Sequence, residues 1–517
     1  MRLFRTRHQL RAASLAAGTV ALLLTATACS AGGSGGGSTA ASGGTLTIVQ
    51  GSAPSSLDPA KINAGPATQY TDLAYSSFFT WQKQGTTPQP MLAKSYEWVG
   101  TGNTHFRIHL RKGVEFSDGT ALTAQAEKQY LEYFMGANGA MSGVAQSIVD
   151  KIETPDAQTV DIYYKTANPD APIDFSEGGT YGSPISPKAI ASKKAELGYA
   201  TFGAGPYTLD QGQTTAGSTY TYVPNPHYYD KSQQRWSKVV VKVIANGNSA
   251  LQAVTTSQNG FTAGSAQQES SAKGSGLTVA SGTPNIYMLM LTDRAGHITP
   301  ALGKTQVRQA LNYAVDRTSI AKLLNGTANE QIIAAGSPGY YDGQLYAQNV
   351  TKAKQLLAAA GYPNGFSFTA IVPNYDSYAS QAAQSVAQDL QKIGVTMKLV
   401  TAPTFQQFQS IQGSKKYSAD VEPWGSTTMS QQAQRLVLPT GNLNIWQDSD
   451  PHLNALYSKG AAQTGSAQTA TWQQLGKAVA EKAWYVPLAT VPTPFFATKD
   501  VRLTDGGYPI YPNPIDF

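Results

Sequence analysis

The feature that most constrains the fold is a strand–helix–strand unit in the second half of the chain. Strand-period alternation over 366–372 is followed by helical spacing over 380–393 and by a second strand at 395–400. A preceding helix is predicted over 352–360. Because a helix joins the two strands, they are expected to pair in parallel within an α/β lobe.

Ligands of open α/β sheets bind beyond the carboxyl ends of the strands. In this unit that rule selects the loops 373–378 and 401–403, and near the N-terminus it selects the turn 51–56, which follows a predicted strand at 45–50. The side chains of these segments that we predict to contact a ligand are Asn374, Tyr375, Ser377, Tyr378 and Ser52.

Other elements are predicted from periodicity alone. Residues 105–110 alternate as a half-buried strand, and 239–244 form another strand. Residues 306–324 carry apolar side chains at helical spacing and are predicted to form one helix that ends at 325–326. Residues 285–290 are predicted to be a strand, and its Tyr287 either faces the core or contacts a ligand.

The N-terminal sequence has the pattern of a secretory signal peptide. Four arginines precede an apolar stretch at 12–28, which is shorter than the ~20 residues of a spanning helix. The chain has a single cysteine, Cys29, at the end of that stretch. A Gly/Ser-rich segment, 30–44, follows and predicts a flexible tether of roughly 20 Å.

The segment from Ala26 to Cys29 resembles a bacterial lipobox, in which the cysteine is acylated and becomes the mature N-terminus. The resemblance predicts lipidation of Cys29 and attachment to the outer face of the cell membrane, although Ala26 stands where a leucine is usual. An ordinary signal peptide with an incidental cysteine is the alternative.

Charge and composition limit the partners. The formal charge of +6 includes the four arginines of the predicted signal, so the mature chain is near +2 (6 minus 4). This balance gives no indication of a nucleic-acid partner. About 470 residues remain after the tether, enough for two or three domains at roughly 100–200 residues each.

An enzyme is the rival class, and its usual signatures are missing from the sequence. The chain has no His-Glu-x-x-His motif, and His105 and His109 would lie roughly 13 Å apart on a strand, too far to share one zinc ion. We therefore predict no catalytic residues, no metal site and no cofactor. A secreted hydrolase stays as the different-class alternative, because scattered carboxylates could still form a pair.

Several motifs together resemble the family 5 solute-binding proteins, the oligopeptide, dipeptide and nickel receptors of bacterial ABC importers. Their order along the chain also resembles the order in that family. The matching segments are 56–59 (SLDP), 93–98 (AKSYEW), 106–120 (FRIHLRKGVEFSDGT), 203–207 (GAGPY), 225–229 (NPHYY), 307–317 (VRQALNYAVDR) and 353–362 (AKQLLAAAGY).

The resemblance implies an α/β fold of two lobes, a type II periplasmic-binding-protein-like clamp of the three-subdomain variety. It has mixed sheets and a hinge between the lobes, and a solute bound between them favours closure. We predict these boundaries: 1–28 signal peptide, 29–44 lipidated cysteine and tether, 45–85 lobe I, 86–200 inserted subdomain of lobe I, 201–290 lobe I, 291–487 lobe II, and 488–517 return to lobe I.

The resemblance also implies a site in lobe II. In the peptide receptors a loop tryptophan packs on the ligand, and an aspartate three residues later holds the peptide ammonium. Trp424 matches the tryptophan and Gly425 follows it, but Thr427 stands at the aspartate position. A hydroxyl cannot offset the desolvation of an ammonium group. Whether Asp420 or Glu422 replaces that aspartate is left open.

Other matching residues are given a structural role. Arg308 and the Asp316–Arg317 pair are predicted to form ion pairs inside lobe II.

The predicted function is that of a monomeric, membrane-tethered receptor that delivers a solute to an ABC permease. An oligopeptide is favoured, and an oligosaccharide or other non-peptide solute is the alternative. A receptor that reports to a membrane sensor would share the same fold.

Overall fold

The computed structural model describes residues 43–62, 67–80, 87–139, 141–177, 179–425 and 428–502. The predicted signal peptide, Cys29 and Thr427 lie outside these residues. Within the described ranges, no helix combines the length and the apolar character needed to cross a membrane.

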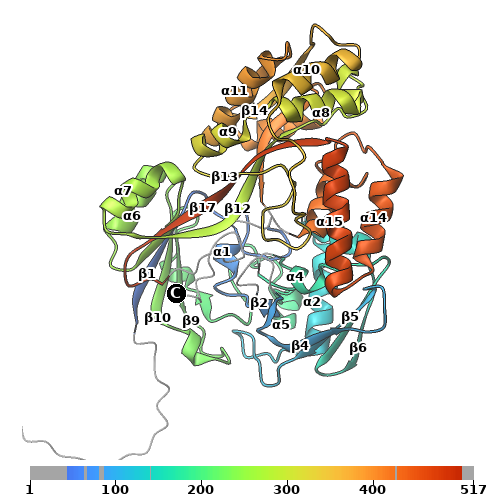
Figure 1. Cartoon of the computed structure of the whole chain (residues 1–517). Coiled ribbons are helices and arrows are strands. Elements are labelled where there is room, and N and C mark those ends of the chain that lie inside the picture. The colour runs from blue at the N-terminus through green and yellow to red at the C-terminus, as the bar shows by residue number, and fades with distance from the viewer. Residues whose placement is uncertain are drawn as a thin grey trace, which may run out of the picture. The chain divides into compact units, whose positions relative to one another are not determined.

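One eleven-stranded mixed sheet organises the chain. Its central strands are β12 (Thr278–Met290) and β17 (Tyr485–Ala497), which pair antiparallel along their whole length. Figure 1 shows them running side by side through the molecule. On one side follow β11 (Gly260–Ala263), β1 (Gly43–Gln50), β10 (Trp236–Val243), β9 (Thr219–Pro224) and β8 (Tyr207–Leu209).

The other half of the sheet contains the predicted crossover unit. Strands β14 (Ser367–Pro373) and β15 (Thr396–Ala402) are parallel and adjacent, and α11 (Ser377–Gln391) joins them, so the predicted topology is confirmed. Strand β16 (Ala419–Gly425) lies between β14 and β12, and the short β13 (Thr327–Ala328) pairs with β17.

Glycines end both helices of the crossover unit. Helix α10 (Val350–Ala359) is followed by Gly361 at φ +87°, and Gly394 follows α11 at φ +80°. Only glycine takes this left-handed conformation without strain, so these positions stop the helices and release the chain into the strands.

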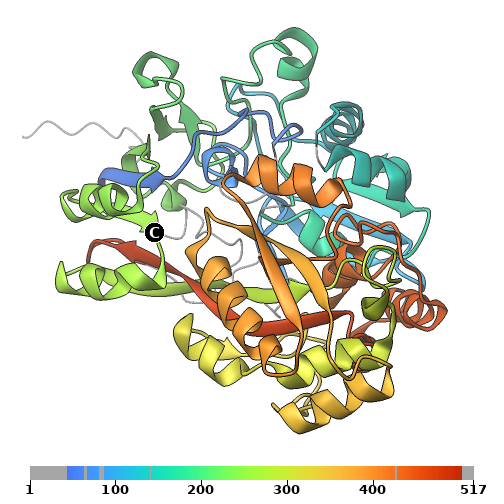
Figure 2. The ribbon, with the colours of Figure 1, turned by 90° about the horizontal axis from the view of Figure 1, so that it is seen from above.

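Helices cover both faces of this half, as Figure 2 shows for the orange strands. Alternate residues of β12 enter two different cores: Tyr287 and Leu289 pack in one, and Ile286 and Met288 in the other. The helices that supply these cores are α8 (Thr305–Ala314), α9 (Arg317–Leu323), α10 and α11, and, for the second core, α13 (Met429–Leu436), α14 (Pro451–Ala461) and α15 (Gly465–Glu481). Helix α12 (Phe405–Gly413) packs on β14 and β15.

A separate four-stranded antiparallel sheet lies within the segment predicted as the inserted subdomain. Its strand β5 (His105–Leu110) has alternately buried and half-buried side chains, as predicted. The other strands of this sheet are β4 (Ala93–Trp98), β6 (Val149–Asp156) and β7 (Thr159–Tyr164). The same segment of the chain contains the helices α2 (Ala124–Gly136), α3 (Ser142–Ile148), α4 (Ala171–Asp174) and α5 (Pro187–Ser192).

The remaining elements are short. They are α1 (Thr68–Thr71), β2 (Phe79–Thr80) paired with β3 (Gln89–Pro90), α6 (Gly247–Thr255), α7 (Glu269–Gly274), and the 3₁₀ turns η1 (Gln211–Gln213), η2 (Lys231–Gln233), η3 (Ala266–Gln268) and η4 (Pro300–Gly303).

The single helix predicted over 306–324 is wrong. The chain forms α8 and α9, separated by Val315 in an extended conformation and by Asp316. The Asp316 carboxylate accepts a hydrogen bond from Ser319 N at 3.0 Å and so begins a new helix. Apolar spacing continues through the break, which is why periodicity alone missed it.

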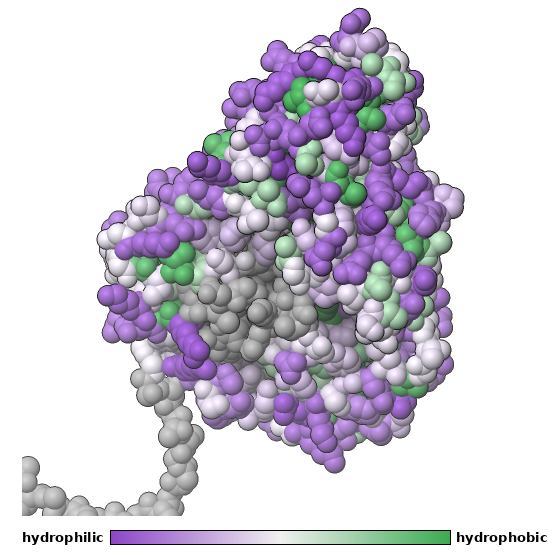
Figure 3. Space-filling model, viewed as in Figure 1, coloured by the Kyte–Doolittle hydropathy of each residue, from purple (hydrophilic) through white to green (hydrophobic). Residues whose placement is uncertain are grey.

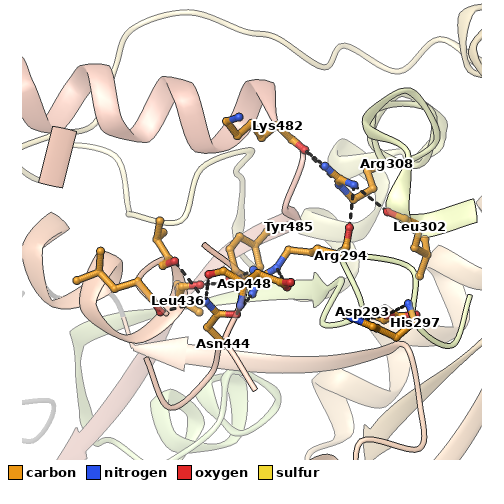
Figure 4. A network of polar contacts seen from close by, with 12 residues as sticks. Asp293, Arg294, His297, Leu302, Arg308, Leu436, Asn444, Asp448, Lys482 and Tyr485 are labelled. Atoms are coloured by element: carbon orange, nitrogen blue, oxygen red, sulfur yellow. Dashed lines mark hydrogen bonds and ion pairs between the residues drawn. The ribbon is translucent and has the colours of Figure 1, made fainter. Parts of the chain in front are cut away.

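The predicted ion pairs of Arg308 and Arg317 are also wrong. Arg308 donates to the carbonyl oxygens of Leu302 and Lys482 at 2.8 and 3.0 Å, as Figure 4 shows. Arg317 donates to backbone oxygens and to Asn312. Both guanidinium groups are buried and hold the turns around α8 and α9 to the start of β17, so their role is structural. Their acceptors are carbonyl oxygens, apart from the Thr305 hydroxyl, which accepts a bond from Arg308 at 3.1 Å.

Candidate functional site

The loop after β14 carries four of the predicted ligand-binding residues. Asn374, Tyr375 and Ser377 are exposed, whereas Tyr378 turns its ring into the core. Asp376 begins α11 by accepting a hydrogen bond from Ala379 N at 3.0 Å. The helix cap therefore fixes the loop in a position that presents Tyr375 to solvent.

Tyr287 of β12 contacts this loop. Its hydroxyl donates to the Asp376 carboxylate at 3.1 Å, and its ring packs edge-on against Tyr378 at 5.9 Å between centroids. Burial and the neighbouring Asp376 charge raise the pKa of Tyr287 above its ordinary value. Tyr287 is only 5% exposed, so a ligand contact by this residue stays a prediction.

Tyr375 has an aromatic neighbour that the sequence did not single out. Phe405, the first residue of α12, lies edge-on to it at 6.4 Å between centroids. Both rings are about half exposed, at 49% for Tyr375 and 52% for Phe405. Exposed apolar patches can mark binding sites, and this pair is a candidate for one. The signal that could have found Phe405 is its place just beyond the predicted loop 401–403.

Strand β16 leads to the predicted tryptophan. The Trp424 ring packs against the core that contains Ile286, its cross-strand neighbour, and the guanidinium of Arg435 lies 5.4 Å from the ring centroid. Its indole N–H is buried without a hydrogen-bond partner among the described residues. Gly425 ends the strand, and its carbonyl oxygen accepts a bond from Gln432 at 3.0 Å.

Two acidic residues precede Trp424 on the same face of β16. Asp420 is 1% exposed and Glu422 is 7% exposed. Burial raises the pKa of Asp420 to about 7, and burial together with the Asp420 charge raises the pKa of Glu422. The Glu422 charge also acts on Tyr375, whose pKa is raised to about 12, chiefly by burial. The charge of Glu422 therefore contributes to the raised pKa of Tyr375 in the loop after β14.

The segment predicted as the inserted subdomain, 86–200, contacts the segment that follows the predicted tryptophan. Asp170 accepts a hydrogen bond from the Thr428 hydroxyl at 2.7 Å, at the start of α13. Asn103 donates to the carbonyl oxygens of Ala461 and Gln463 at 2.8 and 2.9 Å. Neither residue was predicted from the sequence, because contacts with such distant segments leave no local pattern.

Ser52 makes a different contact. It is exposed two residues after the end of β1, and its carbonyl oxygen accepts a hydrogen bond from the Tyr70 hydroxyl at 2.9 Å. The contacts above therefore bring together the 374–378 loop, Tyr287 and β16, but they do not include Ser52. Its role in binding stays a prediction.

In the described part of the chain, no group of three or more His, Cys, Asp or Glu side chains is placed to hold a metal ion. His105 lies 3.2 Å from Asp161, and His109 lies 3.4 Å from Glu97, each in a separate pair. The face drawn in Figure 3 is mostly hydrophilic, with small separate hydrophobic patches.

Comparison with known proteins agrees with this fold. The sequence model described as bacterial extracellular solute-binding proteins, family 5 Middle, matches residues 87–442. Glutathione-binding protein GsiB of Escherichia coli K12 is 25% identical over 396 residues, which cover 74% of this chain and 75% of GsiB.

Solved structures are similar over nearly the whole chain. The periplasmic binding protein DppA of Helicobacter pylori, solved with the peptide STSA, has a TM-score of 0.73 at 21% identity and covers 90% of this chain and 96% of its own. AgaA of A. tumefaciens R10, solved with agropinic acid, has a TM-score of 0.70 at 25% identity and covers 88% and 94%. The two-lobed fold is therefore shown, and the family match spans well over half of the sequence. This chain belongs to the family 5 bacterial extracellular solute-binding proteins.

Proposed function

We propose that this protein is an extracytoplasmic receptor that captures an oligopeptide between its lobes and delivers it to an ABC importer. The observation that carries the proposal is the half-exposed Tyr375–Phe405 pair at the carboxyl ends of β14 and β15, beside the strand that carries Trp424. Open α/β sheets bind their ligands beyond the carboxyl ends of their parallel strands.

The relatives support a peptide as the solute. GsiB is named for binding glutathione, and the H. pylori protein was solved with a tetrapeptide. Because AgaA was solved with agropinic acid, the second candidate is a non-peptide solute, such as an oligosaccharide. Trp424 and Tyr375 offer rings on which either kind of solute could stack.

The finer points of the proposal rest on the sequence. Acylation of Cys29 would hold the receptor at the outer face of the membrane, beside its permease, and the receptor would act as a monomer without catalysis. The lobe boundaries proposed are 45–290 with 488–517 for lobe I and 291–487 for lobe II. The ligand contacts proposed are Trp424, Gly425, Thr427, Tyr287, Ser52 and the loop residues Asn374, Tyr375, Ser377 and Tyr378.

Native mass spectrometry of the purified protein tests the function. The protein is mixed with a pool of tri- and tetrapeptides and with a pool of tri- and tetrasaccharides, and the retained species are identified after denaturation. Retention of peptides supports the proposal, whereas retention of saccharides alone would replace the peptide with the second candidate. Chemical change of a retained compound would contradict a receptor role and favour an enzyme.

A further inference from the structure

Two hydrogen-bonded contacts join the segment 86–200 to the helices α13 and α14. Asp170, directly before α4, accepts a bond from the Thr428 hydroxyl at 2.7 Å, where α13 begins. Asn103, in the turn between β4 and β5, donates from its side-chain nitrogen to Ala461 O at 2.8 Å and to Gln463 O at 2.9 Å, where α14 ends. Figure 1 shows α14 and α15 beside the elements of this segment. The partners are 258 and 358 positions apart in the chain, so these bonds hold distant parts of the molecule together.

Each contact uses the end of a helix. Thr428 is the N-cap of α13 and accepts a bond from Gln431 N at 3.1 Å, so the Asp170 carboxyl group lies at the positive end of that helix. Ala461 is the last residue of α14, and the amide of Asn103 supplies a donor to its carbonyl oxygen, which has no partner within the helix. Both side chains therefore complement the helix ends that they meet.

The two contacts belong to one buried network. Asn168 N donates to Asn103 O at 2.9 Å, and Asp170 N donates to Asn168 Oδ1 at 3.3 Å. The Asn168 side chain also donates to Asp174 Oδ2 at 2.9 Å. Asn103, Asn168 and Asp170 are each at most 5% exposed. Because Asn168 connects the two contact points, we expect them to form and break together.

The parts of the molecule that these bonds join have separate hydrophobic cores. Phe106 of the segment 86–200 shares a core with Ile48 of β1 and Phe261 of β11, whereas Leu453 of α14 belongs to another core. The small side chain of Ala167 packs against that second core. Among the described elements, no helix or strand of 86–200 packs broadly on α13, α14 or α15. The contact is therefore mainly polar, as is typical of interfaces between domains that move relative to each other.

The helix at the first contact, α13, also holds the end of β16. Gln432 donates to Gly425 O at 3.0 Å, and the Arg435 guanidinium lies 5.4 Å from the Trp424 ring centroid. Thr428 lies between these residues in the chain and caps the same helix. Hydrogen bonds and ring contacts thus connect the polar interface to the strand that carries the predicted tryptophan.

We propose that Asn103, Asn168 and Asp170 form a latch that holds the two lobes together in the solute-free protein and sets the ratio of closed to open molecules. Every bond of the latch joins protein to protein, so the latch closes without a contribution from the solute. Because the apparent dissociation constant equals the intrinsic one divided by the closed fraction, the latch raises affinity without contacting the solute. The inference goes beyond the proposed function, since it rests on the proposed lobe boundaries and not on the identity of the solute.

The expected effects follow from the bonds removed. The net contribution of one hydrogen bond corresponds to a factor of roughly 2 to 10 in an equilibrium constant. Asn103 has a φ of +51°, which glycine adopts without strain, so Asn103→Gly removes the amide and leaves the backbone in place. This variant loses two bonds and should lower the ratio of closed to open molecules by about 5- to 100-fold. Asp170→Ala loses one bond and should lower it by about 2- to 10-fold, whereas Asp170→Asn keeps an acceptor for Thr428 and should stay near the wild type.

Small-angle X-ray scattering measures the opening directly. Bound solute is first removed by denaturation and refolding, and each refolded variant is checked by urea denaturation. The radius of gyration of Asn103→Gly and of Asp170→Ala should exceed that of the wild type. Addition of a pool of tri- and tetrapeptides should restore the compact form, with an apparent dissociation constant raised by up to the same factor as the closed fraction falls.

Asn138→Gly is the matched control. Asn138 is exposed, has a φ of +56° and also lies in 86–200, so the same exchange is made at a position away from α13 and α14. Its radius of gyration should equal that of the wild type.

A wild-type radius of gyration in folded Asn103→Gly would overturn the inference, even if the variant is less stable, because the bonds would then have only a structural role. If Asn103→Gly does not refold, Asp170→Ala decides by the same criterion. Failure of the peptide pool to bind would refute the proposed solute, whereas the latch would still be decided by the scattering of the solute-free proteins.

Discussion

Replacement of Arg317 by lysine tests the carbonyl-binding role of the buried arginines. The guanidinium is 7% exposed and donates to Pro487 O at 2.7 Å, Asn312 O at 2.9 Å, Asn312 Oδ1 at 2.6 Å and Tyr346 O at 3.3 Å. A lysine keeps the charge but is a single point donor, so we expect it to reach at most two of these four acceptors.

The magnitude follows from the acceptors left unpaired. Each buried acceptor without a partner costs about 1–3 kcal/mol, so two of them predict a loss of about 3 kcal/mol in the free energy of unfolding. With an m-value of about 3 kcal/mol/M, the urea midpoint should fall by about 1 M. If Arg317 acted only through its charge, the lysine variant would be nearly as stable as the wild type.

The assay is urea denaturation followed by tryptophan fluorescence, at low and high salt. Arg235→Lys serves as the control, because Arg235 is exposed and its replacement should change the free energy by less than about 0.5 kcal/mol. A midpoint for Arg317→Lys equal to that of the control would refute the reasoning. So would a loss of stability that disappears at high salt, since bonds to carbonyl groups inside the protein are screened little.

Three further predictions concern the start of α9, the tryptophan and pH. Asp316→Ala should lower the free energy of unfolding by about 1–2 kcal/mol because α9 loses its cap, as urea denaturation would measure. Trp424→Ala should weaken binding of the pool of tri- and tetrapeptides by at least about tenfold in calorimetry, with an unchanged circular dichroism spectrum. The free energy of unfolding of the ligand-free protein should fall as pH rises from about 4 to about 7. Burial raises the pKa of Asp420 to about 7 in the folded protein, against about 3.9 in the unfolded chain, so the folded state holds this proton more tightly. A pH series of urea midpoints checks this sign, and Glu422→Gln should reduce the slope.

The crossover unit could be predicted because its signals are local. Helix, glycine stop, strand and loop follow one another within about fifty residues, and parallel pairing follows from the connection alone. The 374–378 loop was found by the same rule. The break between α8 and α9 was missed because Val315 continues the apolar spacing across it.

Other features depend on contacts between distant segments. Arg317 binds oxygens of the backbone, which every residue has, so no sequence pattern identifies them. The bond from Thr428 to Asp170 joins residues 258 positions apart. Gln412 donates to the carboxyl groups of both Asp420 and Glu422, at 3.0 and 3.2 Å, yet it is an ordinary helical glutamine in the sequence. Hydrogen bonds between such distant residues can be identified only from a three-dimensional structure.

The central strand pair connects the candidate site to the rest of the large sheet. Strands β12 and β17 join the two halves of the sheet, and their register shifts between Ser281 and Pro284 and again between Tyr287 and Met288. Such irregularities are places where paired strands bend. Tyr287 lies at the second shift and bonds to Asp376 in the loop that carries Tyr375. A solute that moves this loop would act through Asp376 directly on the strand irregularity, so that binding and lobe closure would share one hydrogen-bonded contact.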